Sequence, residues 1–180
     1  FPILLYIWNG EIYNNIGNIF YIKDGKGKIK LYHSNNNLKF EGEYINGKIN
    51  GRGKIYSSYN GELQFEGEYL DGERNGKGIE YDYDGKIIFE GEYKNDKRNG
   101  YGKEYYKKGK IKYEGEYLNG ERTKIKEYYY DGKLKLETDY SEIKNICIGK
   151  EYYENGKIKY EGECSNGLKN GKGKEFFENG

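Results

Sequence analysis

The fold of this chain is decided by one short stretch, Phe65-Glu66-Gly67-Glu68-Tyr69-Leu70-Asp71-Gly72. Its aromatic residues and its first glycine fall on every second position, and glutamates stand between them. Leu63 extends this alternation by one more step toward the N-terminus. A strict period of two predicts a β-strand with one covered face. The Asp71-Gly72 pair then supplies the positive φ angles that a two-residue type I′ turn requires.

The same pattern recurs about every 24 residues, a spacing that is typical of repeat architectures. The tyrosine column comprises Tyr44, Tyr69, Tyr93, Tyr117 and Tyr140, with Cys164 in the equivalent position. The glycine column comprises Gly42, Gly67, Gly91, Gly115 and Gly162, with Thr138 as the exception. Each repeat therefore contributes one strand of the same design.

A second strand follows each of these and carries a Gly-x-Gly pair, such as Gly76 and Gly78, and then an aromatic residue. This aromatic column comprises Tyr56, Tyr81, Tyr105, Tyr129, Tyr152 and Phe176. Asn-Gly or Asp-Gly pairs stand at both ends of most repeats, as at Asn46-Gly47 and Asn60-Gly61, and we expect type I′ turns at both. The sequence predicts an all-β fold, an elongated single-layer antiparallel meander of about seven β-hairpin repeats.

A turn at Asn46-Gly47 sets the expected register of the hairpin. It places Phe40 opposite Gly53, Gly42 opposite Gly51 and Leu38 opposite Ile55. An aromatic ring over a strand glycine restores packing that the glycine lacks. Ile55 and Tyr56 are adjacent, so they share a face only if the strand contains a bulge. Either a bulge lies near the glycine pair, or the second face also carries an aromatic row.

The repeats do not fit the whole chain equally well. Residues 1–15 are interpreted as an N-terminal cap or half-repeat, and residues 16–180 as the repeat array. Within the array, residues 119–145 are degenerate, because Lys124 and Lys126 stand where glycines are expected. We expect the chain to be part of a longer array, with open sheet edges that allow self-association.

The two cysteines are expected to lie opposite each other. An unbroken register about Asn155-Gly156 pairs Cys147 with Cys164, where a disulfide is geometrically conceivable. Two cysteines are too few for a disulfide framework. The chain also contains no Asn-x-Ser/Thr glycosylation sequon. We therefore predict a cytoplasmic protein with reduced thiols.

Charge limits the classes of partner. Charged residues make up 34% of the chain, yet the net charge is only +1 and the sequence pI is about 7.8. Nucleic-acid binders usually show a basic stripe or a high pI, so we expect no nucleic acid. Interleaved lysines and glutamates also give little support for steering to an anionic membrane.

The repeated residues resemble the MORN repeat (membrane occupation and recognition nexus), in the variant common in bacteria, protists and giant viruses. The segment from Phe65 to Gly72 with Gly76 and Gly78 is a close match, and the resemblance covers roughly residues 16–180. Departures lie at Thr138, at the two lysines and at Cys164. The resemblance implies a twisted single-layer sheet used in protein interaction or assembly. Phospholipid binding has been proposed for the family, and some bacterial relatives are described as antitoxin-like.

The sequence offers little catalytic chemistry. His33 is the one histidine, and it lies in a run of asparagines rather than beside a nucleophile and an orienting acid. One histidine and two cysteines do not supply a clustered set of metal ligands. We predict no enzyme, no cofactor and no bound metal.

The tyrosine columns are the surface with binding potential, although they also fit a role as the filling of the sheet. Tyrosine is enriched at interface hot spots, and a thin sheet cannot bury both faces within itself. The candidate partner-binding residues are Tyr44, Tyr69, Tyr93, Tyr117, Tyr56, Tyr81, Tyr105, Tyr129 and Tyr152. We predict a scaffold that presents this surface to protein partners. A phospholipid-binding module and an antitoxin-like inhibitor are the alternatives.

Overall fold

The computed structural model describes residues 10–13, 19–23, 25–141, 146–165 and 168–179. The regular secondary structure in these residues consists of β-strands alone. The chain divides into two units. Unit 1 comprises Phe1–Ile87 and Tyr93–Asp96, and unit 2 comprises Ile88–Glu92 and Lys97–Gly180. The predicted cap at residues 1–15 falls mostly outside the described residues.

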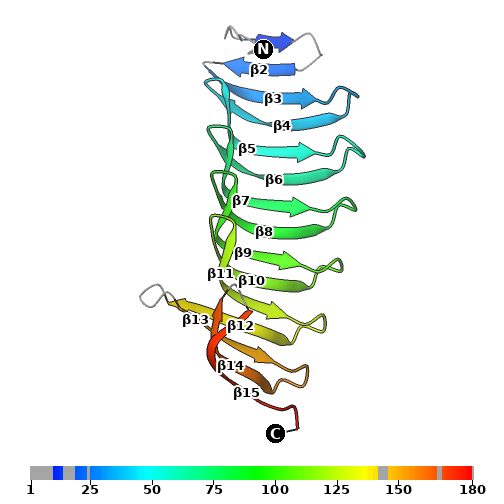
Figure 1. Ribbon diagram of the computed structural model, residues 1–180. Helices are drawn as coiled ribbons and strands as arrows, with labels where there is room; N and C mark the ends of the chain where they lie inside the picture. The colour runs from blue at the N-terminus through cyan, green and yellow to red at the C-terminus, as the bar shows by residue number, and fades with distance from the viewer. Residues whose placement is uncertain (1–9, 14–18, 24, 142–145, 166–167, 180) are drawn as a thin grey trace. The chain divides into compact units, whose positions relative to one another are not determined.

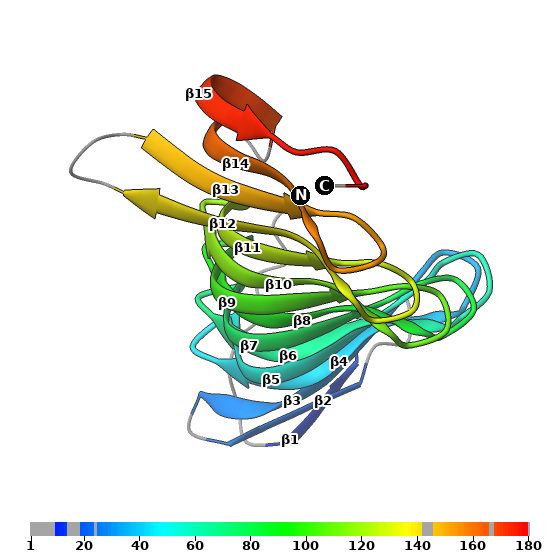
Figure 2. The same cartoon turned by 90° about the horizontal axis from the view of Figure 1, so that it is seen from below.

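The strands pair in chain order as an antiparallel meander, so the predicted fold class is confirmed (Figure 1). The first seven are β1 (Gly10–Tyr13), β2 (Ile19–Lys23), β3 (Lys26–Tyr32), β4 (Leu38–Ile45), β5 (Lys48–Tyr56), β6 (Leu63–Leu70) and β7 (Glu73–Tyr81). Strand β8 (Ile87–Lys94) contributes residues to both units. Unit 2 continues with β9 (Lys97–Tyr105), β10 (Ile111–Leu118), β11 (Glu121–Tyr128), β12 (Leu134–Ser141), β13 (Ile146–Tyr152), β14 (Ile158–Ser165) and β15 (Leu168–Glu175). The strands are curved along their length (Figure 2).

The hairpin turns within each repeat are of the predicted type. Asn46 and Gly47 have φ angles of 47° and 88°, and Asp71 and Gly72 have 54° and 94°. Two consecutive positive φ angles define the type I′ turn, whose twist matches that of the flanking strands. The turn between β8 and β9 has the same form without glycine, at Asn95 and Asp96.

The return turns between repeats differ from the prediction. One residue has a positive φ angle in each described return turn, Asn36 at 64° in the first and a glycine in the others, for example Gly85 at 73°. The turn is longer than two residues, because the backbone N–H of Asp82 bonds to the carbonyl of Lys86. The Asp82 carboxylate also accepts the backbone N–H groups of Asp84 and Lys86. Such side-chain bonds stabilise turns in which asparagine or aspartate keeps its ordinary φ angle.

The predicted register is correct beside the turn and wrong beyond it. The pairs are Ile45–Lys48 and Tyr44–Ile49 near the turn, then Gly42–Gly53 and Phe40–Ile55. A bulge between Gly42 and Tyr44 shifts the pairing, so Phe40 does not lie opposite Gly53. Gly51 has a φ angle of 86°, which no regular strand residue adopts. Strand β5 has more residues than β4 between the pairs Gly42–Gly53 and Tyr44–Ile49, and the bulge at Gly51 accommodates them.

Glycines nevertheless accommodate the aromatic rings, in a diagonal arrangement. Gly67 and Gly78 are directly paired. A Cβ atom at Gly78 would lie 2.5 Å from Cζ of Phe65, and one at Gly67 would lie 2.7 Å from the same atom. The ring therefore lies flat across two adjacent glycine backbones. We call the side of the sheet that carries Phe65, Gly67 and Tyr69 the glycine face, and the side that carries Glu66 and Glu68 the glutamate face.

The degenerate repeat differs in detail from its prediction. Ile125, rather than one of the lysines, takes the place of the paired glycine, because it lies opposite Gly115. Ile125 is buried, at 9% exposure. Gly115 approaches the carbonyl of Lys124 so closely that no Cβ atom would fit.

Cys147 and Cys164 are paired across β13 and β14, as the register predicted, and they form a disulfide. The prediction of reduced thiols is therefore wrong. Their Cα atoms are 4.9 Å apart, within the range that a disulfide spans. Direct opposition on adjacent strands brings the two side chains into bonding range.

Candidate functional site

Aromatic rings pack edge to face on the glycine face of unit 1. The centroid of Phe65 lies 5.8 Å from that of Tyr69 and 5.3 Å from that of Tyr93. Tyr69 is 6% exposed and Tyr93 is 4% exposed, whereas Tyr44 is half-buried. Two of the candidate partner-binding residues, Tyr69 and Tyr93, are therefore buried in the sheet and are not exposed to a partner. Because the glycines let the rings lie close to the backbone, neighbouring rings cover one another.

Unit 2 repeats this packing and adds an arginine that lies over an aromatic ring. Phe89 is completely buried, and its ring centroid lies 5.4 Å from that of Tyr117. The Arg98 guanidinium carbon lies 3.9 Å from the centroid of the same ring, a cation–π contact. Tyr117 is 4% exposed, so it belongs to the core and not to a free surface.

Carboxylates accept hydrogen bonds from the hydroxyl groups of two buried tyrosines. The Tyr93 hydroxyl donates to Glu80 at 2.6 Å, and the Tyr117 hydroxyl donates to Glu104 at 2.8 Å. Burial, strengthened by the bond to Glu104, raises the pKa of Tyr117 to about 12. These bonds satisfy polar atoms inside an otherwise apolar row.

Tyr69 lacks this partner. Its hydroxyl is buried without a hydrogen bond in the described part of the chain. Ile55 lies opposite Phe65 on one side, and Glu80 lies opposite Phe65 on the other. The isoleucine thus occupies in β5 the place that the glutamate has in β7. Burial raises the pKa of Tyr69 to about 12.

Glu104 is the centre of a charged network on the glycine face of unit 2. Its carboxylate lies 3.3 Å from Arg98 and 2.7 Å from Arg122, and its side chain is 15% exposed. The Arg122 guanidinium carbon also lies 3.8 Å from the centroid of Tyr113. Two arginines therefore cover aromatic rings while sharing one carboxylate.

The predicted second aromatic column lies on the glutamate face. Tyr81 donates to Glu66 at 2.7 Å, and Lys54 lies 3.4 Å from the same carboxylate. The tyrosine bond lowers the pKa of Glu66, and burial with that bond raises the pKa of Tyr81 to about 12. Equivalent bonds join Tyr56 to Glu41, Tyr105 to Glu90 and Tyr152 to Glu137. Both alternatives considered for Ile55 and Tyr56 hold, since this face has its own aromatic row and a bulge lies near the glycine pair, between Gly42 and Tyr44.

Tyr129 is not in this row. Tyr128 donates to Glu114 at 2.5 Å, whereas the Tyr129 hydroxyl donates to the backbone carbonyl of Tyr152 at 2.8 Å. Strand β11 has 8 residues and β7 has 9. Because β11 is one residue shorter, the repeat length predicts Tyr129 at the position that Tyr128 occupies.

The return turns expose aromatic side chains that the sheet does not use. Tyr59 is 91% exposed and Tyr83 is 73% exposed in return turns of unit 1, and Phe177, which follows β15, is 83% exposed in unit 2. The Asn60 side-chain amide donates to the backbone carbonyl of Tyr83 at 3.1 Å, so the turns that carry Tyr59 and Tyr83 touch. Sequence reasoning missed these residues because it followed columns that recur in every repeat. Aromatic residues at turn positions, where no strand covers them, were the sequence signal that could have identified these exposed side chains.

The described residues show no catalytic or metal-binding constellation. Among them, no group of three or more histidine, cysteine or acidic side chains could hold a metal ion. His33 lies in a return turn, with Nε2 3.2 Å from the carbonyl of Tyr56. No helix suited to crossing a membrane occurs in this part of the chain.

The architecture is that of a hairpin-repeat protein, and comparison with known families agrees. The family model described as MORN repeat matches residues 40–61, 65–87, 89–111, 113–123 and 160–180. The model described as MORN repeat variant matches residues 25–46, 124–142 and 148–164. The chain therefore belongs to the MORN repeat family. Such repeats are generally found in proteins that interact with proteins or membranes, and the family is typically non-enzymatic. No curated protein matches the chain.

Proposed function

We propose that this chain is a non-enzymatic scaffold that binds a protein partner through the aromatic side chains of its return turns. The observation that carries the proposal is the exposure of Tyr59 and Tyr83 on adjacent turns. Contiguous exposed apolar groups mark interaction sites, and tyrosine is enriched among the residues that dominate binding energy. In this proposal the two tyrosine rows, one mostly buried and one half-buried, stabilise the sheet, and the turns present the contact surface.

The test compares capture of a partner by wild-type protein and by variants of the turn. The double variant Tyr59→Ser/Tyr83→Ser should lose the partner that the wild-type protein retains from its source. Leu70→Ser is the matched control, because Leu70 is 53% exposed at the other end of its strand. Retention of the partner by the double variant, or its loss from the control, would contradict the proposal.

A phospholipid-binding role is the second candidate, and the charge pattern disfavours it. Lysines on the glutamate face pair with glutamates, as in the 3.3 Å contact between Lys150 and Glu161. A surface with alternating signs attracts an anionic bilayer weakly. An antitoxin-like inhibitor would use the same turn surface, and a captured partner with toxic activity would identify it.

A cytoplasmic location stays a prediction. A reducing cytoplasm disfavours disulfides, but the bond between Cys147 and Cys164 is shielded, since these residues are 8% and 9% exposed.

A further inference from the structure

Two neighbouring return turns of unit 2 form a basic and aromatic patch. We call it the lysine–tyrosine cluster and define it as residues 106–113 and 127–135. It contains six lysines, two carboxylates and five tyrosines. The lysines are Lys107, Lys108, Lys110, Lys112, Lys133 and Lys135. This concentration is unlike the chain as a whole, whose net charge is +1.

Contacts between the turns hold the cluster together. The ring centroids of Tyr106 and Tyr130 are 5.4 Å apart. Lys110 Nζ lies 4.9 Å from the centroid of Tyr130, and Lys112 Nζ lies 5.1 Å from that of Tyr113. The Tyr106 hydroxyl donates to the carbonyl of Tyr128. The rings thus position the ammonium groups before any partner arrives.

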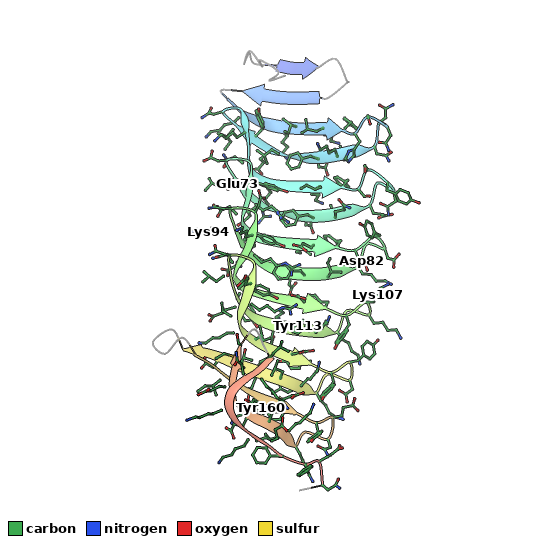
Figure 3. The ribbon with its side chains drawn as sticks, viewed as in Figure 1. Glu73, Asp82, Lys94, Lys107, Tyr113 and Tyr160 are labelled. Atoms are coloured by element: carbon green, nitrogen blue, oxygen red, sulfur yellow. A yellow bond between two sulfur atoms is a disulfide. The ribbon has the colours of Figure 1, made fainter. Side chains whose placement is uncertain are left out.

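The first turn carries charge that the described residues do not neutralise. The two carboxylates of the cluster are already paired, Asp131 with Lys133 at 2.9 Å and Glu127 with Lys135 at 2.6 Å. No carboxylate of the described residues forms an ion pair with Lys107 or Lys108, and both are exposed. Lys107 projects from the turn in Figure 3. In the second turn Tyr130, the ring that Lys110 contacts, remains 45% exposed.

We infer that the lysine–tyrosine cluster binds an acidic, extended segment of a protein partner, with carboxylates on Lys107 and Lys108 and an apolar side chain against Tyr130. The inference rests on the proposed scaffold function and names the chemistry of one partner. Adjacent hairpins in a meander repeat after about 10 Å, the length of roughly three extended residues. A short peptide therefore spans both turns.

The limited extent of the patch favours a peptide over other polyanions. The next return turn of unit 2 exposes Glu154, which a flat anionic membrane would also meet. A single-stranded nucleic acid usually follows a longer continuous basic groove. A peptide needs only the two turns, and complementary charge sets its position and its rate of association.

The test measures binding of a fluorescein-labelled peptide in which glutamates flank one central leucine. Fluorescence anisotropy should show saturable binding to the full chain that weakens with salt, and no binding of the same peptide with glutamines in place of glutamates. Lys107→Glu/Lys108→Glu should weaken binding by about tenfold or more. Lys172→Glu/Lys174→Glu is the matched control, since both lysines are exposed on β15 of the same unit, and it should change affinity less than about twofold.

Circular dichroism should confirm that both variants keep the β-sheet signal. Equal binding by wild type and the turn variant would overturn the inference. Failure of the peptide to bind the wild-type chain would also overturn it. The same holds if the chain binds phosphatidylserine vesicles or oligodeoxythymidine and does not bind the peptide. Partner capture through Tyr59 and Tyr83 is a separate measurement. If the peptide test fails but this capture is still observed, the inference about the cluster is wrong and the scaffold proposal is unaffected.

Discussion

The hydroxyl of Tyr117 donates a hydrogen bond of 2.8 Å to Glu104, the carboxylate that also pairs with Arg98 and Arg122. One residue of β9 therefore joins a donor of β10 to an arginine of β11 and an arginine of its own strand. A connection across three successive strands stabilises a sheet that has no second layer among the described residues of its unit. It also makes the contribution of this carboxylate measurable.

Replacement of Glu104 should destabilise the fold. Glu104→Ala removes the carboxylate that Tyr117, Arg98 and Arg122 share, and the expected loss in the free energy of unfolding is about 2–4 kcal/mol. Urea denaturation followed by circular dichroism measures it. Glu121→Ala removes an exposed carboxylate at the start of β11 and should change stability by less than about 0.5 kcal/mol. Similar values for the two variants would show that the network contributes nothing.

Two tyrosine-to-phenylalanine variants should have opposite effects. Tyr69→Phe removes a buried hydroxyl that has no hydrogen-bond partner among the described residues, so stability should stay the same or rise by up to about 1 kcal/mol. Tyr117→Phe removes the donor to Glu104 and should lower stability by about 1 kcal/mol. Each is the other's control, because both positions are buried in the same column. A loss for Tyr69→Phe as large as that for Tyr117→Phe would mean that the first hydroxyl is hydrogen-bonded in solution.

Stability should fall steeply at alkaline pH. Burial raises the pKa of Tyr69, Tyr81 and Tyr117 to about 12 from the usual value of 10.0. The folded state holds these protons more tightly, so their stabilising effect is complete below pH of about 10 and is lost as pH rises toward about 12. Denaturation midpoints across this range, with tyrosinate absorbance recorded in parallel, provide the measurement. A midpoint that does not move while tyrosinate forms would contradict the assignment.

The glycine pair beneath Phe65 should not tolerate a methyl group. Gly78→Ala places Cβ 2.5 Å from Cζ of a ring that is 3% exposed, and the expected loss is about 2 kcal/mol. Gly149→Ala is the control, because its nearest heavy atom would be 3.4 Å away. That variant should lose less than about 1 kcal/mol. Thermal denaturation of both variants separates steric exclusion from a general effect of replacing strand glycines.

Reduction should weaken unit 2 through Cys147 and Cys164. Their disulfide closes a loop with a sequence separation of 17, for which chain entropy gives roughly 3 kcal/mol. Peptide mapping without reductant should recover the two cysteines in one linked pair, and a reducing agent should lower the midpoint of urea denaturation. Cys147→Ser/Cys164→Ser should show no further response to the reductant. Free thiols in the native, air-equilibrated protein would refute the pairing.

The sequence determined the strands, the hairpin turns and the direct opposition of Cys147 and Cys164. Alternation, Asn-Gly pairs and a constant repeat length are local signals, and a meander needs few others because each strand pairs with its chain neighbour. Only the tertiary structure decided which rows are covered. The burial of Tyr69 and Tyr117 depends on a bulge at glycine and on rings from adjacent strands. The position of Tyr128 depends on the length of one strand.

The same distinction applies to the candidate surface. Columns that recur in every repeat hold the sheet together, because each ring must meet the same neighbours in the next repeat. Tyr59, Tyr83 and Lys107 occupy turn positions, where the residue type changes along the array, and they lie exposed. Their exposure is a property of the turn geometry, which depends on side-chain bonds from residues such as Asp82 rather than on the strand pattern.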